Sequence, residues 1–353
     1  MKILFLSSIP SPYQIDFIRA MARESDIKIS AYFLWNSKKN RNWKFDMDEN
    51  MTVAGFGHKP ADYLKFYRHV KKTRPEIIFI GGYRIPLFTL AVILARVNGI
   101  KVVLWLERPF ERAGLFGWLK RLYLKAKLKT PDAIIAIGGK AEKIYKKYQR
   151  KTFNLPYSMD LEKYYKIERP SKAGDGISFL FSGQFIERKN VLNLVKAFKS
   201  LRRRDITLNI IGSGELDGQL AGEAEKDERV RILGFIDPAG LPGIFSGSDV
   251  FILPSYHDGW GLVVNEAMAS AMPVIGTSRA DAVHEFIRHK ENGYICGTCP
   301  DSIRGALEYY INNRKAVLEH GQINRQMISR SDADVKNAVN TFKKIMGEVL
   351  ISK

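Results

Sequence analysis

Short apolar segments alternate with amphipathic helical patterns along the 353 residues, and this alternation constrains the fold more than any other feature of the chain. Strands of continuous apolar character separated by helices are typical of a parallel sheet covered on both faces. The pattern runs once through the first half and restarts near residue 178. The sequence therefore predicts an α/β protein with two Rossmann-like, doubly wound parallel-sheet domains. The expected strands are Lys2–Leu6, Ile27–Leu34, Ile77–Ile80, Val102–Leu106, Ala133–Ile137, Ser178–Phe181, Thr207–Ile211, Val230–Leu233, Val250–Leu253 and Pro273–Gly276.

The best candidate for a linker is Ile167–Gly176, because Pro170 and Gly174 within it interrupt regular structure. We therefore expect one domain over residues 1–168, a second over 169–331, and a helix over 332–353 that crosses back to the first domain. Ligands of doubly wound folds bind outside the carboxyl ends of the strands. Two such domains facing each other predict a ligand site in the cleft between them.

Composition excludes several classes of protein. The two cysteines, Cys296 and Cys299, are too few for a disulfide scaffold, and a zinc site would need about four ligands. The six histidines are scattered, so we expect no metal. The longest strongly apolar stretch, Ile85–Ala95, is about half of the roughly 20 residues that a membrane span needs. We expect a cytoplasmic protein, either free or peripheral on the inner face of the cell membrane.

Basic charge is concentrated in the first half of the chain. The net charge is +19, and residues 1–170 hold 33 Lys and Arg against 15 Asp and Glu. A field of one sign favours an anionic partner, such as a nucleic acid, a phospholipid surface or an acidic substrate. The segment Gly117–Lys129 places five cations on a mixed amphipathic helix. That helix fits attachment to anionic lipid, or equally a sheet-covering helix with a basic exposed face.

A glycine-bearing turn, Asp258-Gly259-Trp260-Gly261, follows the predicted strand Val250–Leu253 and opens a helix. Glycines let the backbone come close to a ligand, and the free amides at a helix start attract an anion such as a phosphate. Glu266 lies two turns into the helix among apolar neighbours, where a ribose diol is a natural partner. The alternative interpretation is an acid that favours the helix dipole, followed by a solvated glutamate.

This segment resembles the signature of retaining family-4 glycosyltransferases with the GT-B fold, of the type that builds bacterial envelope polysaccharide. The resemblance lies in an acid, seven residues and a glutamate, in the setting acid-Gly-aromatic-Gly-Leu, then Glu-Ala-Met-Ala and Pro-Val-Ile. The family usually has Glu where this chain has Asp258. The resemblance implies that Glu266 accepts hydrogen bonds from the ribose hydroxyls. It also implies that the donor sugar and diphosphate meet the backbone of Gly259, Trp260, Gly261, Leu262 and Val263.

The stretch Phe181–Phe198 is similar to the family motif Gly-Arg-x-x-x-x-Lys-Gly. Gly183 and Gln184 stand at the Gly-Arg positions, and Lys189 matches the lysine that holds the diphosphate. Arg188 is the cation that could replace the arginine missing at Gln184. A leaving nucleoside diphosphate gains negative charge in the transition state, which fixed cations stabilise. An ordinary basic pair is the alternative, although a helix start suits cations poorly unless an anion binds there.

Two further glycine turns fit the resemblance by their position. Gly212 and Gly214 follow the predicted strand Thr207–Ile211, and Gly234 and Phe235 follow the next strand. The resemblance implies that these residues line the donor site, with Gly234 and Phe235 beside the nucleobase. A single Gly-x-Gly after a strand is a weak signal, since any tight turn can use it. Core packing of Phe235 is an equal alternative.

The first half matches the family by architecture only. Its loop Ser8–Tyr13 contains no glycine, whereas the loop at this place in the family is glycine-rich. Glu107 follows the predicted strand Val102–Leu106, and the carboxyl-end rule makes it face the cleft, so we assign it to the catalytic group on the acceptor side. Arg84 is a second acceptor-side candidate. Either charge could instead stabilise its loop.

Together with these features, the family resemblance implies a hexosyltransferase of polysaccharide biosynthesis. It would move a sugar from a nucleoside-diphosphate sugar, with UDP favoured over GDP, to a hydroxyl of a lipid-linked or cell-envelope glycan. Asp258, Arg188, Lys189 and Glu107 form the predicted catalytic group. We expect no metal, no cofactor besides the donor substrate, no nucleic-acid partner, and contact of the basic half with an anionic membrane surface. The alternatives are a nucleotide-sugar epimerase on the same fold, and a non-catalytic basic protein that binds nucleic acid or membrane.

Overall fold

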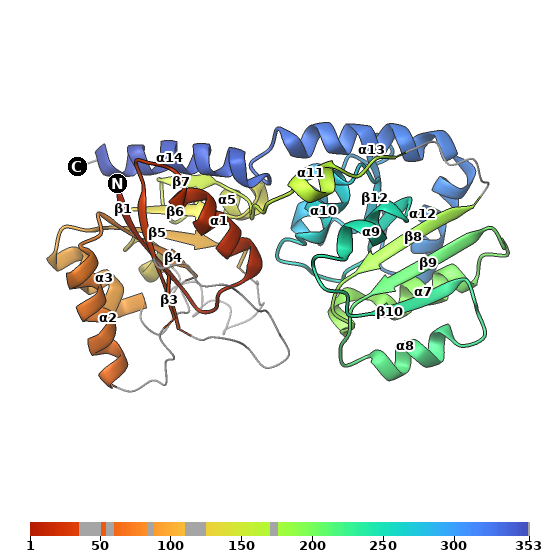
Figure 1. Ribbon diagram of the computed structural model, residues 1–353, viewed down its shortest axis with the longest axis horizontal. Helices are drawn as coiled ribbons and strands as arrows, with labels where there is room; N and C mark the ends of the chain where they lie inside the picture. The colour runs from red at the N-terminus through yellow and green to blue at the C-terminus, as the bar shows by residue number, and fades with distance from the viewer. Residues whose placement is uncertain (35–50, 54–59, 83–87, 110–124, 170–175, 352–353) are drawn as a thin grey trace. The chain divides into compact units, whose positions relative to one another are not determined.

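The chain forms two compact units, which the computed structural model describes over residues 1–34, 51–53, 60–82, 88–109, 125–169 and 176–351 (Figure 1). Unit 1 comprises Met1–Asp160 and Asp332–Lys353, and unit 2 comprises Leu161–Ser331. The chain therefore passes from the first unit to the second after Asp160 and returns after Ser331.

Unit 1 is built on a parallel sheet of seven strands in the order β3-β2-β1-β4-β5-β6-β7. Its strands are β1 (Lys2–Ser7), β2 (Lys28–Phe33), β3 (Met51–Val53), β4 (Ile77–Gly81), β5 (Lys101–Leu106), β6 (Ala133–Ala136) and β7 (Thr152–Asn154). Its helices are α1 (Pro12–Ala22), α2 (Pro60–Thr73), α3 (Phe88–Val97), α5 (Gly139–Tyr145) and α14 (Val335–Ile351).

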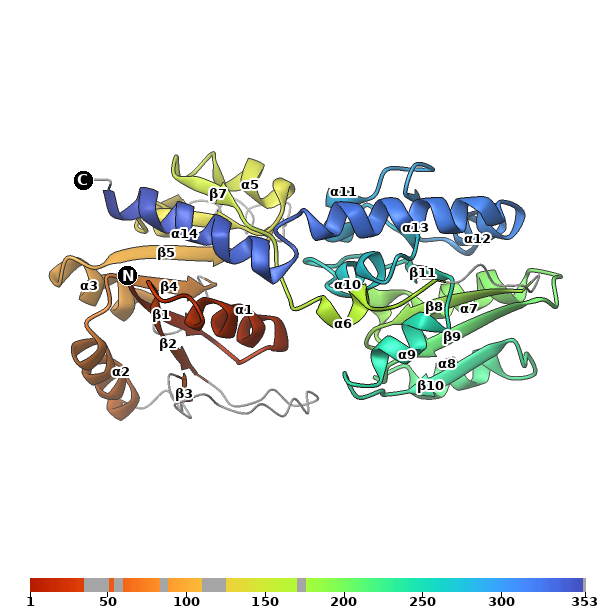
Figure 2. The same cartoon turned by 45° about the horizontal axis from the view of Figure 1, so that its top comes forward.

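Helices cover both faces of this sheet, as the continuous apolar strands require. One face packs Leu4, Ile78 and Leu104 against buried residues of α2, α3 and α5. The opposite face carries an aromatic cluster, in which the Phe79 ring lies 5.6 Å from that of Trp105. Phe342 of α14 completes the cluster, since its ring lies 5.1 Å from the Phe79 ring and α14 runs beside α1 (Figures 1 and 2). The last helix therefore belongs to the core of unit 1.

Unit 2 has a parallel sheet of six strands in the order β10-β9-β8-β11-β12-β13. Its strands are β8 (Ile177–Ser182), β9 (Ile206–Ile211), β10 (Val230–Gly234), β11 (Val250–Leu253), β12 (Val274–Gly276) and β13 (Gly293–Ile295). Its helices are α6 (Glu162–Tyr165), the 3₁₀ turn η1 (Glu187–Lys189), α7 (Val191–Lys199), α8 (Asp217–Ala224), α9 (Leu241–Ser246), α10 (Val263–Ala269), α11 (Asp281–Phe286), α12 (Pro300–Asn312) and α13 (Arg314–Ser329).

The strand order of unit 2 reverses between β8 and β11. The chain runs outward from β8 through β9 to β10, then returns to place β11 on the other side of β8. Such a reversal is the topological switch point, outside whose carboxyl ends open α/β sheets bind their ligands. The loops that follow β8 and β11 are therefore the place to look for a site in this unit.

All ten predicted strands are present, and the doubly wound α/β class is confirmed for both units. Three strands of three residues each, β3, β7 and β13, escaped prediction, as did the helices α6, α11 and α13. The amphipathic helix predicted within Gly117–Lys129 lies largely outside the described residues, as do Arg84 and most of the expected linker. Arg169, at the start of that linker, is held in unit 2 by hydrogen bonds to the carbonyls of Phe245, Ser248 and Ser270.

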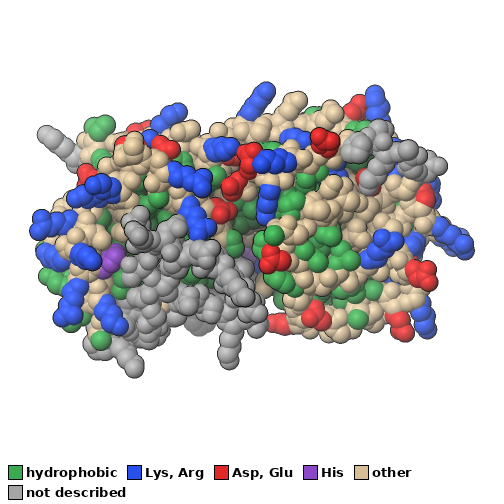
Figure 3. Space-filling model, viewed as in Figure 1, with side chains coloured by type: hydrophobic (Ala, Val, Ile, Leu, Met, Phe, Trp, Pro, Cys, Tyr) green, Lys and Arg blue, Asp and Glu red, His purple; other side chains and the backbone are tan. Residues whose placement is uncertain are grey.

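Basic side chains gather over the α2 and α3 end of unit 1 (Figure 3). No helix within the described ranges is long and apolar enough to cross a bilayer. Within the same ranges, no group of three or more His, Cys, Asp or Glu side chains could hold a metal ion.

Candidate functional site

The loops after β8 and β11 bring three charged side chains together at the switch point of unit 2. Arg188 and Lys189 lie in η1, in the loop after β8, and Asp258 lies in the loop after β11. Arg188 Nη1 is 3.2 Å from Asp258 Oδ1, and the Lys189 ammonium forms an ion pair with Asp258 Oδ2. The sequence predicted these residues for one site, and the structure places them in direct contact.

The charges of this cluster do not cancel. Lys189 and Asp258 are both buried, and a buried ammonium or carboxylate requires a partner of opposite charge. Arg188 is the second cation on the same carboxylate, and its side chain is 39% exposed. Two cations against one carboxylate leave one positive charge in excess at the edge of the cluster. The arrangement is therefore suited to an anion that arrives from solvent.

Backbone contacts hold the two loops in register. The Tyr256 amide donates to the Arg188 carbonyl at 2.9 Å, and Arg188 Nη1 donates to the His257 carbonyl at 2.8 Å. Asn190, in the left-handed region at φ 61°, donates from Nδ2 to the Pro254 carbonyl at 3.0 Å. The cations are thus fixed by the fold before any ligand binds, which is the condition for strong electrostatic stabilisation of a developing charge.

Glu266 lies in α10, the helix that follows the Asp258 loop, and is buried. Its Oε1 accepts a hydrogen bond of 2.7 Å from the Tyr164 hydroxyl of α6. Burial raises the pKa of the Glu266 carboxyl, while the Tyr164 hydrogen bond and the charge of Lys163 act in the opposite direction. Tyr164 was not among the predicted site residues. It precedes the expected linker in the sequence, and no motif marks it.

Gly212 and Gly214 have a packing reason that the sequence could not show. The loops after β8 and β9 interlock, because the Phe185 amide donates to the Ser213 carbonyl at 2.9 Å. A Cβ on Gly212, whose φ is +140°, would lie 1.9 Å from the Gly183 carbonyl oxygen. A Cβ on Gly214 would lie 2.5 Å from the Phe185 oxygen. Close approach of two loops explains these glycines, and their contact with a donor stays a prediction.

Phe235 is 68% exposed, so the alternative that it packs in the core is wrong. It follows Gly234, whose φ is +69° and whose carbonyl accepts from the Gly212 amide at 2.9 Å. Gly234 thereby joins the same glycine-lined edge as Gly183 and Gly212. An exposed aromatic ring at that edge is available to a planar ligand.

Trp260 differs from the other residues of its turn, because its side chain is 2% exposed and belongs to the core. The indole Nε1 donates to Asn265 Oδ1 at 3.3 Å, and the ring packs against Phe286. Any contact of Trp260 with a ligand would therefore involve its backbone. Gly259, Leu262 and Val263 are half-exposed, and Gly261 adopts φ +97°.

Glu107 and Gln184 are both exposed, in different units. Glu107 directly follows β5 in unit 1, and its carbonyl accepts a 2.7 Å hydrogen bond from the Tyr145 hydroxyl. Its side chain bonds to the Tyr157 hydroxyl, which also bonds to Tyr13, and burial raises the pKa of Tyr157. Glu107 thus has a defined place at the carboxyl end of the first sheet. Its catalytic role stays a prediction.

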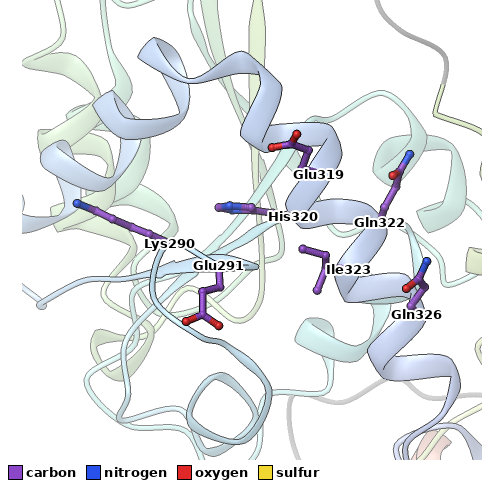
Figure 4. Close-up of a pocket in the computed structure, with 7 residues that line it drawn as sticks. All are labelled: Lys290, Glu291, Glu319, His320, Gln322, Ile323 and Gln326. Atoms are coloured by element: carbon purple, nitrogen blue, oxygen red, sulfur yellow. The ribbon is translucent and has the colours of Figure 1, made fainter.

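A separate hollow of about 460 Å³ lies on unit 2 between α13 and the turn that precedes β13 (Figure 4). Seven residues line it: Lys290, Glu291, Glu319, His320, Gln322, Ile323 and Gln326. None of them belongs to the predicted site. The hollow combines both signs of charge, and the His320 ring is already engaged by the Tyr310 hydroxyl at 2.9 Å.

Residues 162–327 match the family model described as Glycosyl transferases group 1. Unit 2 is therefore a glycosyltransferase group 1 domain. The matched range contains the Arg188–Lys189–Asp258 cluster, Glu266 and all the predicted donor-binding residues. The predicted glycosyltransferase domain is confirmed for unit 2.

Curated relatives of this chain include proteins described as glycosyltransferases. An uncharacterized glycosyltransferase of Haemophilus influenzae is 26% identical over 317 residues, which cover 86% of this chain and 87% of the relative. Phosphatidyl-myo-inositol mannosyltransferase of Mycobacterium tuberculosis is 28% identical over 188 residues. That match covers 52% of this chain and 49% of the relative.

Solved structures resemble nearly the whole chain. HepE of Anabaena in complex with UDP superposes with a TM-score of 0.77 and 14% identity, covering 99% of this chain and 100% of that one. The lipopolysaccharide outer core galactosyltransferase WaaB gives a TM-score of 0.74 and 17% identity, covering 99% of each. These likenesses confirm the predicted fold class, two doubly wound units of the GT-B type.

Proposed function

We propose that this chain is a metal-independent, retaining glycosyltransferase of family 4 that uses a nucleoside-diphosphate sugar. The observation that carries the proposal is the cluster of Arg188 and Lys189 with Asp258 at the switch point of a glycosyltransferase group 1 domain. Fixed cations at the carboxyl edge of a parallel sheet suit a diphosphate. They stabilise the leaving nucleoside diphosphate, whose negative charge grows as the bond to the sugar breaks.

In the proposed mechanism, each charged group of the cluster has its own task. Lys189 and Arg188 bind the diphosphate and supply the positive charge that a metal provides in other transferases. Asp258 holds the two cations in place, and its carboxylate faces the transferred sugar. The leaving phosphate takes the proton of the acceptor hydroxyl, so a separate general base is not required. Glu266 accepts hydrogen bonds from the ribose hydroxyls, and Phe235 stacks on the nucleobase.

We propose UDP as the nucleotide of the donor. Support comes from the neighbouring Anabaena protein, which is described in complex with UDP and with UDP-glucose. The exposed Phe235 ring offers a stacking surface for a base. It directly follows Gly234, whose carbonyl accepts from the Gly212 amide at 2.9 Å, so the ring is held at the same edge of the sheet as the other predicted donor-binding turns. A thermal-shift screen of UDP-, GDP- and ADP-sugars tests the assignment, because a ligand that binds only the folded state raises the melting temperature.

For the acceptor, we propose a glycan or lipid-linked sugar at an anionic membrane surface. Support comes from the solvent-facing side of α2 and α3 in unit 1, called here the α2–α3 surface. It combines exposed cations with exposed apolar side chains, a combination that favours an anionic lipid interface. Its members are Leu64, Lys65, Tyr67, Arg68, Lys71 and Lys72 of α2, with Ile93 and Val97 of α3. Lys71 Nζ ties the helices together by donating to Asn98 Oδ1 at 3.0 Å.

An epimerase on the same fold would convert the donor with no acceptor present. Incubation of the protein with UDP-sugars alone, followed by separation of the nucleotide products, distinguishes the two functions. The transferase proposal predicts slow release of UDP and free sugar, whereas an epimerase would yield a second nucleotide sugar.

A further inference from the structure

The single turn α6 is the first helix of unit 2 after the chain crosses from unit 1, and it reaches the predicted nucleoside site with two consecutive side chains. Tyr164 is fully buried, with its ring 5.3 Å from that of Phe245, and its hydroxyl donates to Glu266 Oε1 at 2.7 Å. The neighbouring Lys163 Nζ donates to the Pro238 carbonyl at 2.9 Å, just beyond Phe235. One turn of helix thus contacts both the carboxylate and the segment beside the exposed aromatic ring.

The carboxylate of Glu266 is only partly satisfied by the protein. Among the described residues, the Tyr164 hydroxyl is its one hydrogen-bond donor, and that bond is made to Oε1. A buried carboxylate that keeps free acceptor positions costs folding free energy unless a ligand completes it. A phenol has a single proton to donate, so the bond fixes the orientation of the carboxyl group and leaves Oε2 for a partner.

We propose that Tyr164 is a positioning residue for ribose recognition, which keeps the Glu266 carboxylate ionised and aims its second oxygen at the vicinal hydroxyls of the nucleotide. This inference rests on the proposed function, because it concerns how the donor site of that function is held. The proposed role depends on the hydroxyl group of Tyr164 and not only on its ring. If Tyr164 served only for packing, phenylalanine at position 164 would fill the same space and UDP binding would not change.

The groups that lower the pKa of Glu266 and so favour its ionised form lie on α6. Burial raises the pKa of the Glu266 carboxyl, and the two groups that lower it, the Tyr164 hydroxyl and the Lys163 ammonium, both belong to α6. Helix α13 contributes Arg325, which donates to the Ala269 carbonyl. The ionisable groups of the third neighbouring helix, α11, are Asp281, His284 and Glu285. Strands β11 and β12 contribute no ionisable side chain.

Loss of the Tyr164 hydroxyl has a predictable dependence on pH. Without that hydrogen bond, the pKa of Glu266 rises further, so the carboxyl protonates at a higher pH than in the wild type. A protonated carboxyl accepts hydrogen bonds poorly. Nucleotide affinity of Tyr164→Phe should therefore fall as the pH is lowered, over a range in which the wild-type affinity changes less.

The test is a calorimetric titration of UDP into the wild type, Tyr164→Phe, Glu266→Gln and the double variant at pH 8 and pH 5.5. We expect Tyr164→Phe to bind UDP about tenfold more weakly at pH 8, and still more weakly at pH 5.5. The terminal phosphate of UDP also takes up a proton between these pH values, so each Tyr164→Phe protein is compared with its Tyr164 parent at the same pH. In the Glu266→Gln background the Tyr164→Phe change should cost little, and by the same small factor at both pH values. With 2′,3′-dideoxy-UDP, the wild type and Tyr164→Phe should bind alike.

Tyr310→Phe is the matched control, because Tyr310 is a fully buried tyrosine of the same unit whose hydroxyl contacts His320. It should bind UDP as the wild type does. Equal UDP affinities of Tyr164→Phe and wild type at both pH values would overturn the inference and leave the proposed function standing. So would a loss that is equally large in the Glu266→Gln background. If the wild type binds none of UDP, GDP and ADP, the proposed function fails and this inference fails with it.

Discussion

Lys189 and Asp258 form a buried ion pair across two loops, although 69 positions separate them in the sequence. The loops meet because β8 and β11 are parallel neighbours at the switch point, so that both end at the same edge of the sheet. Two motifs that stand far apart in the chain thus build one charged corner. A fold in which these loops left from opposite edges would have separated them.

Replacement of Lys189 by alanine should lower sugar transfer by about 10²–10³-fold, because one fixed cation on the leaving diphosphate is lost. UDP release from a UDP-sugar, followed in a coupled assay, measures the effect. Lys199→Ala is the matched control, since Lys199 lies in the same unit at the end of α7 and contacts Glu223 instead. Equal rates for the two variants would argue against the assigned role of Lys189.

Replacement of Asp258 by asparagine should separate binding from turnover. The variant removes the one carboxylate that opposes two cations, so the site becomes more positive. UDP should bind at least as tightly as to the wild type, and its affinity should fall more steeply with added salt. Transfer should be strongly reduced, because the carboxylate that faces the sugar is gone. Weaker UDP binding together with normal transfer would contradict the role assigned to Asp258.

Replacement of Gly212 by alanine should destabilise unit 2 by about 2 kcal/mol or more, because its Cβ meets the Gly183 oxygen and its φ is +140°. Chemical denaturation monitored by fluorescence measures the change. Gly222→Ala is the control, since Gly222 lies in α8 with nothing near its Cβ. That variant should gain about 0.5–1 kcal/mol from helix propensity. If Gly212→Ala left the stability unchanged, the loops after β8 and β9 would not interlock as described.

Replacement of Phe342 by alanine should cost about 3–5 kcal/mol in the unfolding of unit 1, because the ring is fully buried against Phe17 and Phe79. UDP binding, which the account assigns to unit 2, should persist under native conditions. Ile351 is 85% exposed in the same helix, so Ile351→Ala should change stability by less than about 0.5 kcal/mol. Similar losses for both variants would show that α14 does not complete the core of unit 1.

Reversal of three charges on the α2–α3 surface should abolish membrane attachment. Lys65→Glu, Arg68→Glu and Lys72→Glu together should remove sedimentation with vesicles that contain phosphatidylglycerol, at about 1 kcal/mol for each basic side chain near the surface. UDP binding should be unchanged. Lys315→Glu, an exposed change in unit 2, is the control. Binding of the wild type to duplex DNA but not to the vesicles would favour the nucleic-acid alternative.

The sequence predicted the elements whose signal is local and strong. β1, β5 and β8 are continuous apolar runs, and the pattern identified each of them within a residue. Strands of three residues, such as β7 and β13, are too short to show a period of two. Their pairing depends on the neighbouring strand, which the sequence does not reveal.

The charged residues of the site could be predicted from the sequence, whereas the contacts that hold them in place could not. The Arg188–Lys189 and Asp258 motifs have a chemical purpose that can be inferred from residue type, and the structure brings them together. Tyr164 could not be found in this way, because its partner Glu266 is 102 positions away and a tyrosine in a single helical turn carries no signal. Phe235 was ambiguous because exposure depends on the packing around it.

The most direct test of the central claim is a pair of calorimetric titrations, of UDP and of uridine, into the wild type and the double variant Arg188→Ala with Lys189→Ala. If the corner binds the diphosphate, UDP affinity should fall by about 100-fold or more in the double variant, at about 1.5–3 kcal/mol for each charged hydrogen bond lost. Uridine, which has no phosphate, should bind both proteins equally weakly. Equal affinity of UDP for the two proteins would contradict the account.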